Sequence, residues 1–192
     1  AMGGAPGAKS RLSAEKRLFL VWVLIATLTA IGTAICLELD AFASVDKMDA
    51  TKLSFLTIAV FGIMTIYCGR LSWSTSVILD DIDRLKSAGQ PNSAAKRLAE
   101  LENIENNVEH GWFAVGLCEK LGLLGTICGF IIMLSGGINI QGADPQAIQG
   151  LLEKLSLGLS TAFVTTLVGL ICSIALSLQC HNLSTAIEKA KK

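Results

Sequence analysis

Four of the threonines inside the long uncharged stretches of the chain are candidate functional residues, because few side chains there can form hydrogen bonds. They are Thr126 in the run Leu121–Ala143, and Thr161, Thr165 and Thr166 in the run Leu155–Ile187. A hydroxyl donates one hydrogen bond and accepts others. These side chains are therefore suited either to bonding a carbonyl of their own helix or to lining a narrow polar path. Spacing alone does not decide between the two roles.

Small residues accompany these threonines at helical spacing. In the run Leu155–Ile187, small residues recur at steps of three or four residues from Gly158 to Ser177. This spacing places them on one helical face. Small side chains let membrane helices approach closely. We therefore predict helix-packing roles, with the helices of adjacent copies as the expected contact, for Gly122, Gly125, Gly129, Gly158, Ala162, Gly169 and Ser173.

The composition indicates a membrane protein. The chain is 52% hydrophobic and only 17% charged, whereas soluble domains carry about 25% charged residues. Its charges leave four uncharged runs, and a helix that crosses a bilayer needs about 17–25 residues. We predict an all-α integral membrane protein with four transmembrane helices in the runs Leu18–Leu37, Leu53–Gly69, Leu121–Ala143 and Leu155–Ile187.

The first run follows a basic start, as a signal peptide would, but its length and the three later runs favour an uncleaved helix. The distribution of basic residues predicts the orientation. The segments 1–17, 70–120 and 188–192 hold 13 of the 16 Lys and Arg residues. The positive-inside rule therefore places both termini and the long middle segment in the cytoplasm.

The middle segment, residues 70–120, has apolar residues at helical spacing on both sides of the sequence AGQPN. Gly89 is a suitable C-cap, Pro91 disfavours helix at the residue before it, and Ser93 is a suitable N-cap. We predict a cytoplasmic helical hairpin, the stalk, whose apolar stripes pack on each other or on neighbouring copies. The stripe residues are Val77, Ile78, Ile82 and Leu85, and Leu98, Leu101, Ile104 and Val108.

The predicted organisation has five parts. They are an N-terminal cytoplasmic lead (1–17), a transmembrane hairpin (18–69), the stalk (70–120), two further membrane helices (121–183) and a basic tail (184–192).

No pattern typical of an enzyme, a cofactor site or a metal site is found in the sequence. The six cysteines lack paired spacings and are interpreted as packing residues. No nucleophile–base pair or phosphate loop is recognised, so we predict no catalytic residues. The balance of 16 acidic and 16 basic residues gives no sign of nucleic-acid binding.

Two motifs carry a resemblance to a known family. LGLLGT, Leu121–Thr126, followed by TTLVGL, Thr165–Leu170, resembles the MotA/TolQ/ExbB proton-channel family, over roughly residues 115–183. The resemblance implies that Thr126 and Thr166 are pore-facing threonines. It also implies a homopentameric ring in the bacterial inner membrane, and a single-span partner of the ExbD, TolR or MotB type that supplies an aspartate. Ion flow would then drive rotation of ring against partner.

The subfamily stays open. The ExbB and TolQ branch has a proline where this chain has Ala175 and tends to have a glutamate where it has Thr161, and it has one span before its cytoplasmic segment rather than two. A second hypothesis from a different class also stands. In it the chain is a structural membrane protein whose small residues only pack helices and whose stalk docks a cytoplasmic partner.

Overall fold

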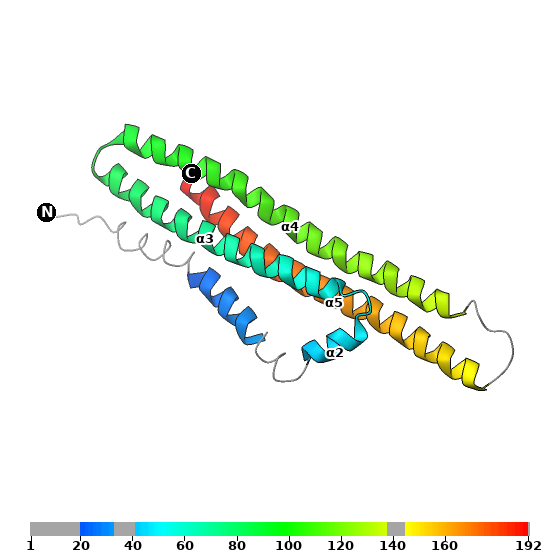
Figure 1. The fold of residues 1–192 in the computed structure, drawn as a ribbon. Helices are drawn as coiled ribbons and strands as arrows, with labels where there is room; N and C mark the ends of the chain where they lie inside the picture. Colours follow the sequence, from blue (N-terminus) through cyan, green and yellow to red (C-terminus); the bar gives the residue numbers. More distant parts are fainter. Residues whose placement is uncertain (1–19, 33–40, 138–144, 192) are drawn as a thin grey trace. The chain divides into compact units, whose positions relative to one another are not determined.

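The computed structural model describes residues 20–32, 41–137 and 145–191, and these form helices with short turns at residues 49–52 and 88–90 (Figure 1). After the helix Leu20–Gly32 come α2 (Ala41–Met48), α3 (Leu53–Ser87), α4 (Pro91–Gly137) and α5 (Pro145–Lys191). Within the described residues, α3, α4 and α5 are long and apolar enough to cross a membrane. The chain is thus an all-α protein of the membrane type.

Each long helix exceeds what a bilayer requires. Helices α4 and α5 have 47 residues each, which is roughly 70 Å at about 1.5 Å per residue, against a hydrocarbon core about 30 Å thick. The first predicted span is described only in part, as the 13 residues Leu20–Gly32, while residues 18, 19 and 33–37 lie outside the described residues.

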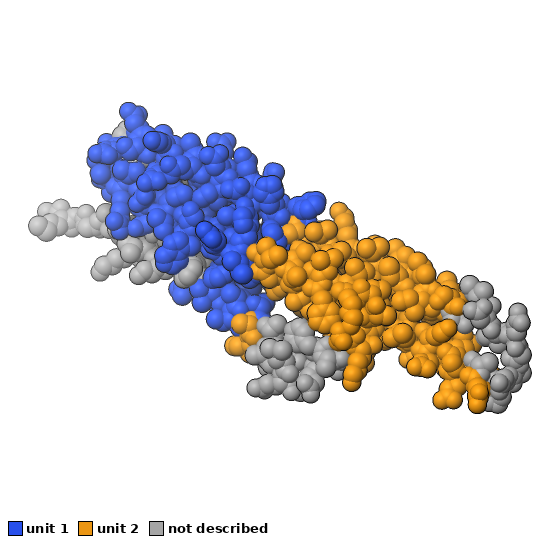
Figure 2. Space-filling view, in the orientation of Figure 1, with its two compact units in different colours: residues 1–29, 64–113, 176–192 blue, residues 30–63, 114–175 orange. Residues whose placement is uncertain are grey.

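The helices contribute to two compact units (Figure 2). Unit 1 comprises residues 1–29, 64–113 and 176–192, and unit 2 comprises residues 30–63 and 114–175. Unit 1 contains an apolar core to which α3, α4 and α5 all contribute. Its buried residues are Ile78, Ile82, Leu101, Ile104, Val108, Leu183 and Ile187.

This core gives the predicted apolar stripes their partners. The stripes of α3 and α4 pack on each other, and α5 supplies a third face through Leu183 and Ile187. The segment 184–191, expected as a basic tail, forms the last turns of α5, and Ile187 is 1% exposed. Val77 is 49% exposed and does not belong to this core, because it is offset by one residue from the buried positions Ile78 and Ile82.

The turn between α3 and α4 follows from three residues. Gly89 has a φ of +70°, a left-handed conformation that glycine adopts without steric cost. The N–H of Gln90 donates to the carbonyl of Leu85 at 3.1 Å, which satisfies a carbonyl at the end of α3. Helix α4 begins at Pro91, since proline is favoured in the first helical position. The prediction that Ser93 caps α4 was therefore wrong, because Ser93 lies within the first turn.

Two buried thiols lie close together in unit 1. The Sγ atoms of Cys68 on α3 and Cys180 on α5 are 3.9 Å apart. Gly111 on α4 leaves room for them, since an added Cβ would come within 2.6 Å of the Cys180 sulfur. All five described cysteines are free thiols, and Cys36 lies outside the described residues.

Candidate functional site

The α4–α5 contact in unit 2 brings together the glycines and threonines of the two sequence motifs. The two helices are in close contact at glycines, because a Cβ on Gly129 would come within 2.6 Å of the Gly158 carbonyl oxygen. One added to Gly169 would lie 2.9 Å from the Cα of Gly122. A Cβ on Gly125 would overlap the side chain of Thr165. Glycine at these positions therefore permits backbone-to-backbone packing.

This contact lies within one chain, which differs from the expectation for adjacent copies. Gly122, Gly125 and Gly129 of α4 face Gly158, Ala162, Thr165 and Gly169 of α5 in the same molecule. The spacing that indicates close approach is the same for both kinds of contact, so the sequence could not distinguish them. Ser173, the remaining predicted packing residue, is 8% exposed.

Thr126 and Thr166 meet across this contact. Their hydroxyls are hydrogen-bonded to each other. Each hydroxyl is also within hydrogen-bond distance of a carbonyl of its own helix, Thr126 of Gly122 at 3.1 Å and Thr166 of Ala162 at 2.9 Å, so one hydroxyl donates to its carbonyl while the other donates to its threonine partner. Each hydroxyl has a single proton to donate but further capacity to accept. Both side chains are half-buried rather than enclosed.

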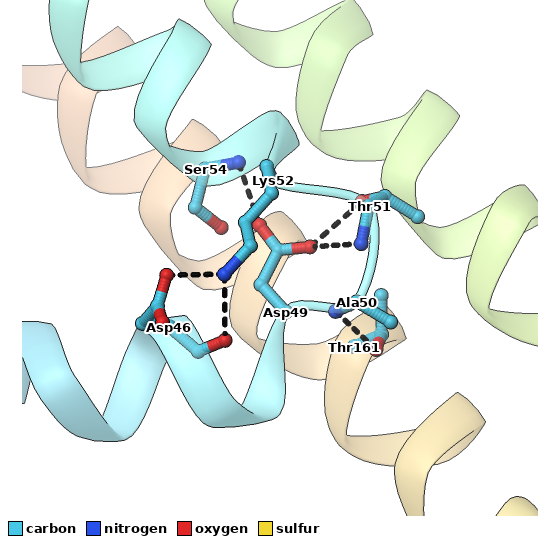
Figure 3. A network of polar contacts seen from close by, with 7 residues as sticks. All are labelled: Asp46, Asp49, Ala50, Thr51, Lys52, Ser54 and Thr161. Carbon is cyan, nitrogen blue, oxygen red and sulfur yellow. Dashed lines mark hydrogen bonds and ion pairs between the residues drawn. The ribbon is translucent and has the colours of Figure 1, made fainter.

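Thr165 and Thr161 have different surroundings from this pair. Thr165 is 1% exposed, and its hydroxyl donates to the Thr161 carbonyl at 2.8 Å. Thr161 is fully buried, and its hydroxyl donates to the carbonyl of Met48 at 2.8 Å. The backbone N–H of Ala50 donates to the same hydroxyl at 3.2 Å. Thr161 thus binds the turn between α2 and α3 to α5 (Figure 3).

That turn is organised around the carboxylate of Asp49. The carboxylate is buried and accepts the N–H of Ser54 at 2.8 Å, in the first turn of α3, where backbone N–H groups lack helical partners. It also accepts the N–H and the hydroxyl of Thr51, at 3.0 and 2.7 Å. Burial disfavours the charged form, but the hydrogen bonds from Ser54 and Thr51 outweigh it and hold the pKa of Asp49 below 3.8.

Lys52 completes the turn in an uncommon backbone conformation. Its φ is +57°, a left-handed value that is costly for residues with a side chain. The ammonium forms an ion pair with the Asp46 carboxylate and donates to the Asp46 carbonyl at 3.0 Å. Figure 3 shows the Lys52 side chain reaching back to Asp46 while Asp49 faces Thr51 and Ser54. No pattern in the sequence predicted α2 or this network.

Comparison with known protein families matches residues 85–192 to the MotA/TolQ/ExbB proton channel family. The match covers the second half of the stalk hairpin and both motif helices, and it agrees with the resemblance carried by the two motifs. No curated protein and no solved structure matches the chain. The family is one of proton channels rather than of catalysts. With a match over more than half of its length, the chain belongs to the MotA/TolQ/ExbB proton channel family.

Proposed function

We propose that the chain is a ring-forming stator subunit of a proton-driven motor, in which Thr126 and Thr166 line the ion pathway. The observation that carries this proposal is the hydrogen bond between the two hydroxyls, one from each motif helix. Both are half-buried in an otherwise apolar stretch. In a family of proton channels, such a pair offers a polar step for a carboxyl group or a transient water.

The titrating group comes from a partner. The runs Leu121–Ala143 and Leu155–Ile187 hold no ionisable Asp, Glu, Lys or Arg, although intramembrane ionisable groups are the usual means of relaying protons. A single-span membrane protein with an aspartate near the two threonines supplies the missing carboxylate. Its protonation and release, past Thr126 and Thr166, couple ion flow to rotation of the ring against the partner.

The assembly proposed is a closed homopentamer in the bacterial inner membrane. Each subunit has four spans, both termini in the cytoplasm and a cytoplasmic hairpin stalk. Because the motif glycines are engaged between α4 and α5 of one chain, contacts between copies involve other faces. Exposed apolar residues suited to this, or to lipid, include Leu123, Ile127 and Ile131 on α4, and Phe163, Leu167 and Ile174 on α5.

The proposal is limited to two of the four predicted pathway threonines. Thr161 and Thr165 are buried, with hydroxyls that donate to backbone carbonyls. We assign them to holding the α2–α3 turn and the α4–α5 contact. The alternative, a structural membrane protein, is favoured by one observation: Thr126 and Thr166 also have carbonyl partners within their own helices.

Removal of the two hydroxyls separates these functions. The double variant Thr126→Val, Thr166→Val keeps the side-chain volume but removes both hydroxyls. A group that forms a hydrogen bond to these hydroxyls is then left without a partner, which costs about 1–3 kcal/mol. We expect assembly to survive and proton flux to fall by about tenfold or more. Flux is measured with a pH-sensitive dye inside vesicles that contain the chain and its single-span partner.

The matched control is Thr57→Val. The Thr57 hydroxyl donates to the Leu53 carbonyl of its own helix at 2.9 Å, so the substitution removes the same group from a site outside the pair. Flux in this variant should equal that of the parent. Undiminished flux in the double variant would refute the pathway and leave the packing function.

A further inference from the structure

A groove of about 440 Å³ lies between the helix Leu20–Gly32 and α3 in unit 1. The lining is almost wholly apolar, and Trp22 and Ala26 of the first helix and Ile66, Gly69, Arg70 and Trp73 of α3 contribute to it. All of these residues precede residue 85, so the groove lies outside the part of the chain that matches the family.

Gly69 shapes the floor of this groove. A Cβ at this position would overlap the indole ring of Trp22. Only glycine therefore allows the ring to lie directly against α3. The indole is amphipathic, with a large apolar surface and one N–H donor, which is why tryptophan gathers at the boundary between lipid and water.

The sequence places the groove at that boundary. Gly69 is the last residue of the uncharged run Leu53–Gly69, and Arg70 is the first charge after it. On the side of the apolar run, lining residue Ile66 is 66% exposed and neighbouring Ile63 is 67% exposed. Such a surface is covered by lipid in a membrane protein, so the groove is continuous with the lipid-facing surface.

Arg70 brings a positive charge to this surface. It is exposed, and among the described residues no carboxylate pairs with it. Of the acidic residues further along α3, Asp80 pairs with Arg84 at 2.8 Å and Asp81 with Arg97 at 3.2 Å. A guanidinium recognises phosphate through paired hydrogen bonds.

We propose that this groove binds an anionic phospholipid of the surrounding bilayer. One acyl chain lies along the apolar wall formed by Ala26 and Ile66, and the lipid phosphate accepts hydrogen bonds from Arg70. The rings of Trp22 and Trp73 flank the glycerol region. Basic pockets between membrane helices bind anionic headgroups for these reasons. The inference is independent of the threonine pathway.

Tryptophan fluorescence tests the proposal directly. The chain has three tryptophans, so the Trp112→Phe variant retains only Trp22 and Trp73, which both line the groove. This variant is reconstituted into phosphatidylcholine vesicles with a small fraction of brominated phosphatidylglycerol or brominated phosphatidylcholine. We expect phosphatidylglycerol to reach half-maximal quenching at about a fivefold lower mole fraction, the effect of one basic residue near the surface.

Three further substitutions in that background identify the groove as the site. Arg70→Gln should abolish the headgroup preference, and Arg70→Lys should retain part of it, which excludes a folding defect as the cause. Lys96→Gln removes the same charge from an exposed position on α4 outside the groove and should leave the preference intact. Ala26→Phe fills the groove and should weaken quenching by both lipids.

Equal quenching by the two brominated lipids in the Trp112→Phe chain would overturn the proposal. So would a preference that survives Arg70→Gln, or one that Lys96→Gln reduces equally, since the latter would reflect only the net charge of the protein. Absence of quenching by either lipid would show that another molecule covers the groove and would also overturn it.

Discussion

The carboxylate of Asp49 holds the turn between α2 and α3 together. It is fully buried, and a buried carboxylate is costly unless its oxygens accept hydrogen bonds. Both oxygens do so, one from the backbone of α3 and the other from Thr51. The fully buried Thr161 then joins the same turn to α5 through the backbone of Met48 and Ala50.

Substitution of Asp49 by Asn should lower stability by about 1–3 kcal/mol, because the amide NH2 replaces one of two accepting oxygens and leaves a donor of the turn without an acceptor. The folded chain has a lowered Asp49 pKa, so the stabilisation is present above the ordinary pKa of 3.8 and is lost as the pH falls through the folded value. The difference in thermal midpoint between parent and Asp49→Asn should be constant near neutral pH and shrink below about pH 4.

Asp46→Asn is the control for this prediction. Its ion pair with Lys52 is exposed, and exposed pairs contribute only about 0–1 kcal/mol. A larger loss in Asp46→Asn than in Asp49→Asn would contradict the assignment of the turn to the buried carboxylate.

Thr126 and Thr161 differ in how far their contacts can be predicted from the sequence. The two motifs indicated Thr126 and Thr166 because their types and spacing are visible in short windows of sequence. The hydrogen bond from Thr161 to Met48 joins residues 113 positions apart, and no local sequence pattern predicts it. We expected Thr161 and Thr165 to line the pathway because they lie near the same helical face as Thr166. The structure distinguishes them, since their side chains are buried whereas those of Thr126 and Thr166 are half-buried.

At the scale of elements, glycine controls the contact between α4 and α5. Replacing Gly129 with Leu would force a side chain into the backbone of Gly158 and Ala162. Overpacking of this kind costs about 1–3 kcal/mol, and we expect a lower thermal midpoint in detergent and loss of the assembled species on size-exclusion chromatography.

Gly116 provides the matched control on the same helix. A Cβ at Gly116 meets no other atom within 4 Å, so Gly116→Leu should leave both measurements unchanged. Equal behaviour of the two leucine variants would mean that α4 and α5 do not pack through their glycines.

Elements with strong local signals were predicted well from the sequence. Gly89 and Pro91 indicate the end of α3 and the start of α4, because glycine permits the left-handed conformation that ends a helix and proline favours the first helical position. Helix α2 has only eight residues, which is too short for apolar periodicity to reveal it. The start of α4 was misjudged by three residues, since a helix capped by Ser93 would begin at residue 94, whereas Pro91 already supplies the first helical position.

At the scale of the whole molecule, the orientation in the membrane is the next property to test. The bias of basic residues predicts that the segment 38–52 and the stalk lie on opposite sides of the bilayer. Lys47 and Ser93, both exposed, are replaced singly by Cys and treated with a membrane-impermeant maleimide on intact cells. We expect Lys47→Cys to react and Ser93→Cys to react only after lysis.

The parent chain serves as the background in this experiment, because four of its described cysteines are buried and Cys128 is only partly exposed. Reaction of both variants in intact cells would contradict the predicted topology, as would protection of both. Four membrane crossings with cytoplasmic termini would then no longer describe the chain.

The exposed turn Ala88–Gln90 also bears on how such a chain evolves. It carries no buried side chain, and the arms on either side bury residues at helical spacing, such as Ile78 and Ile82 on α3 and Leu101 and Ile104 on α4. About seven residues make two helical turns and return to the same face. Insertions or deletions of that size in both arms preserve the buried face, so the hairpin can change length in paired steps while the motif helices keep their sequence.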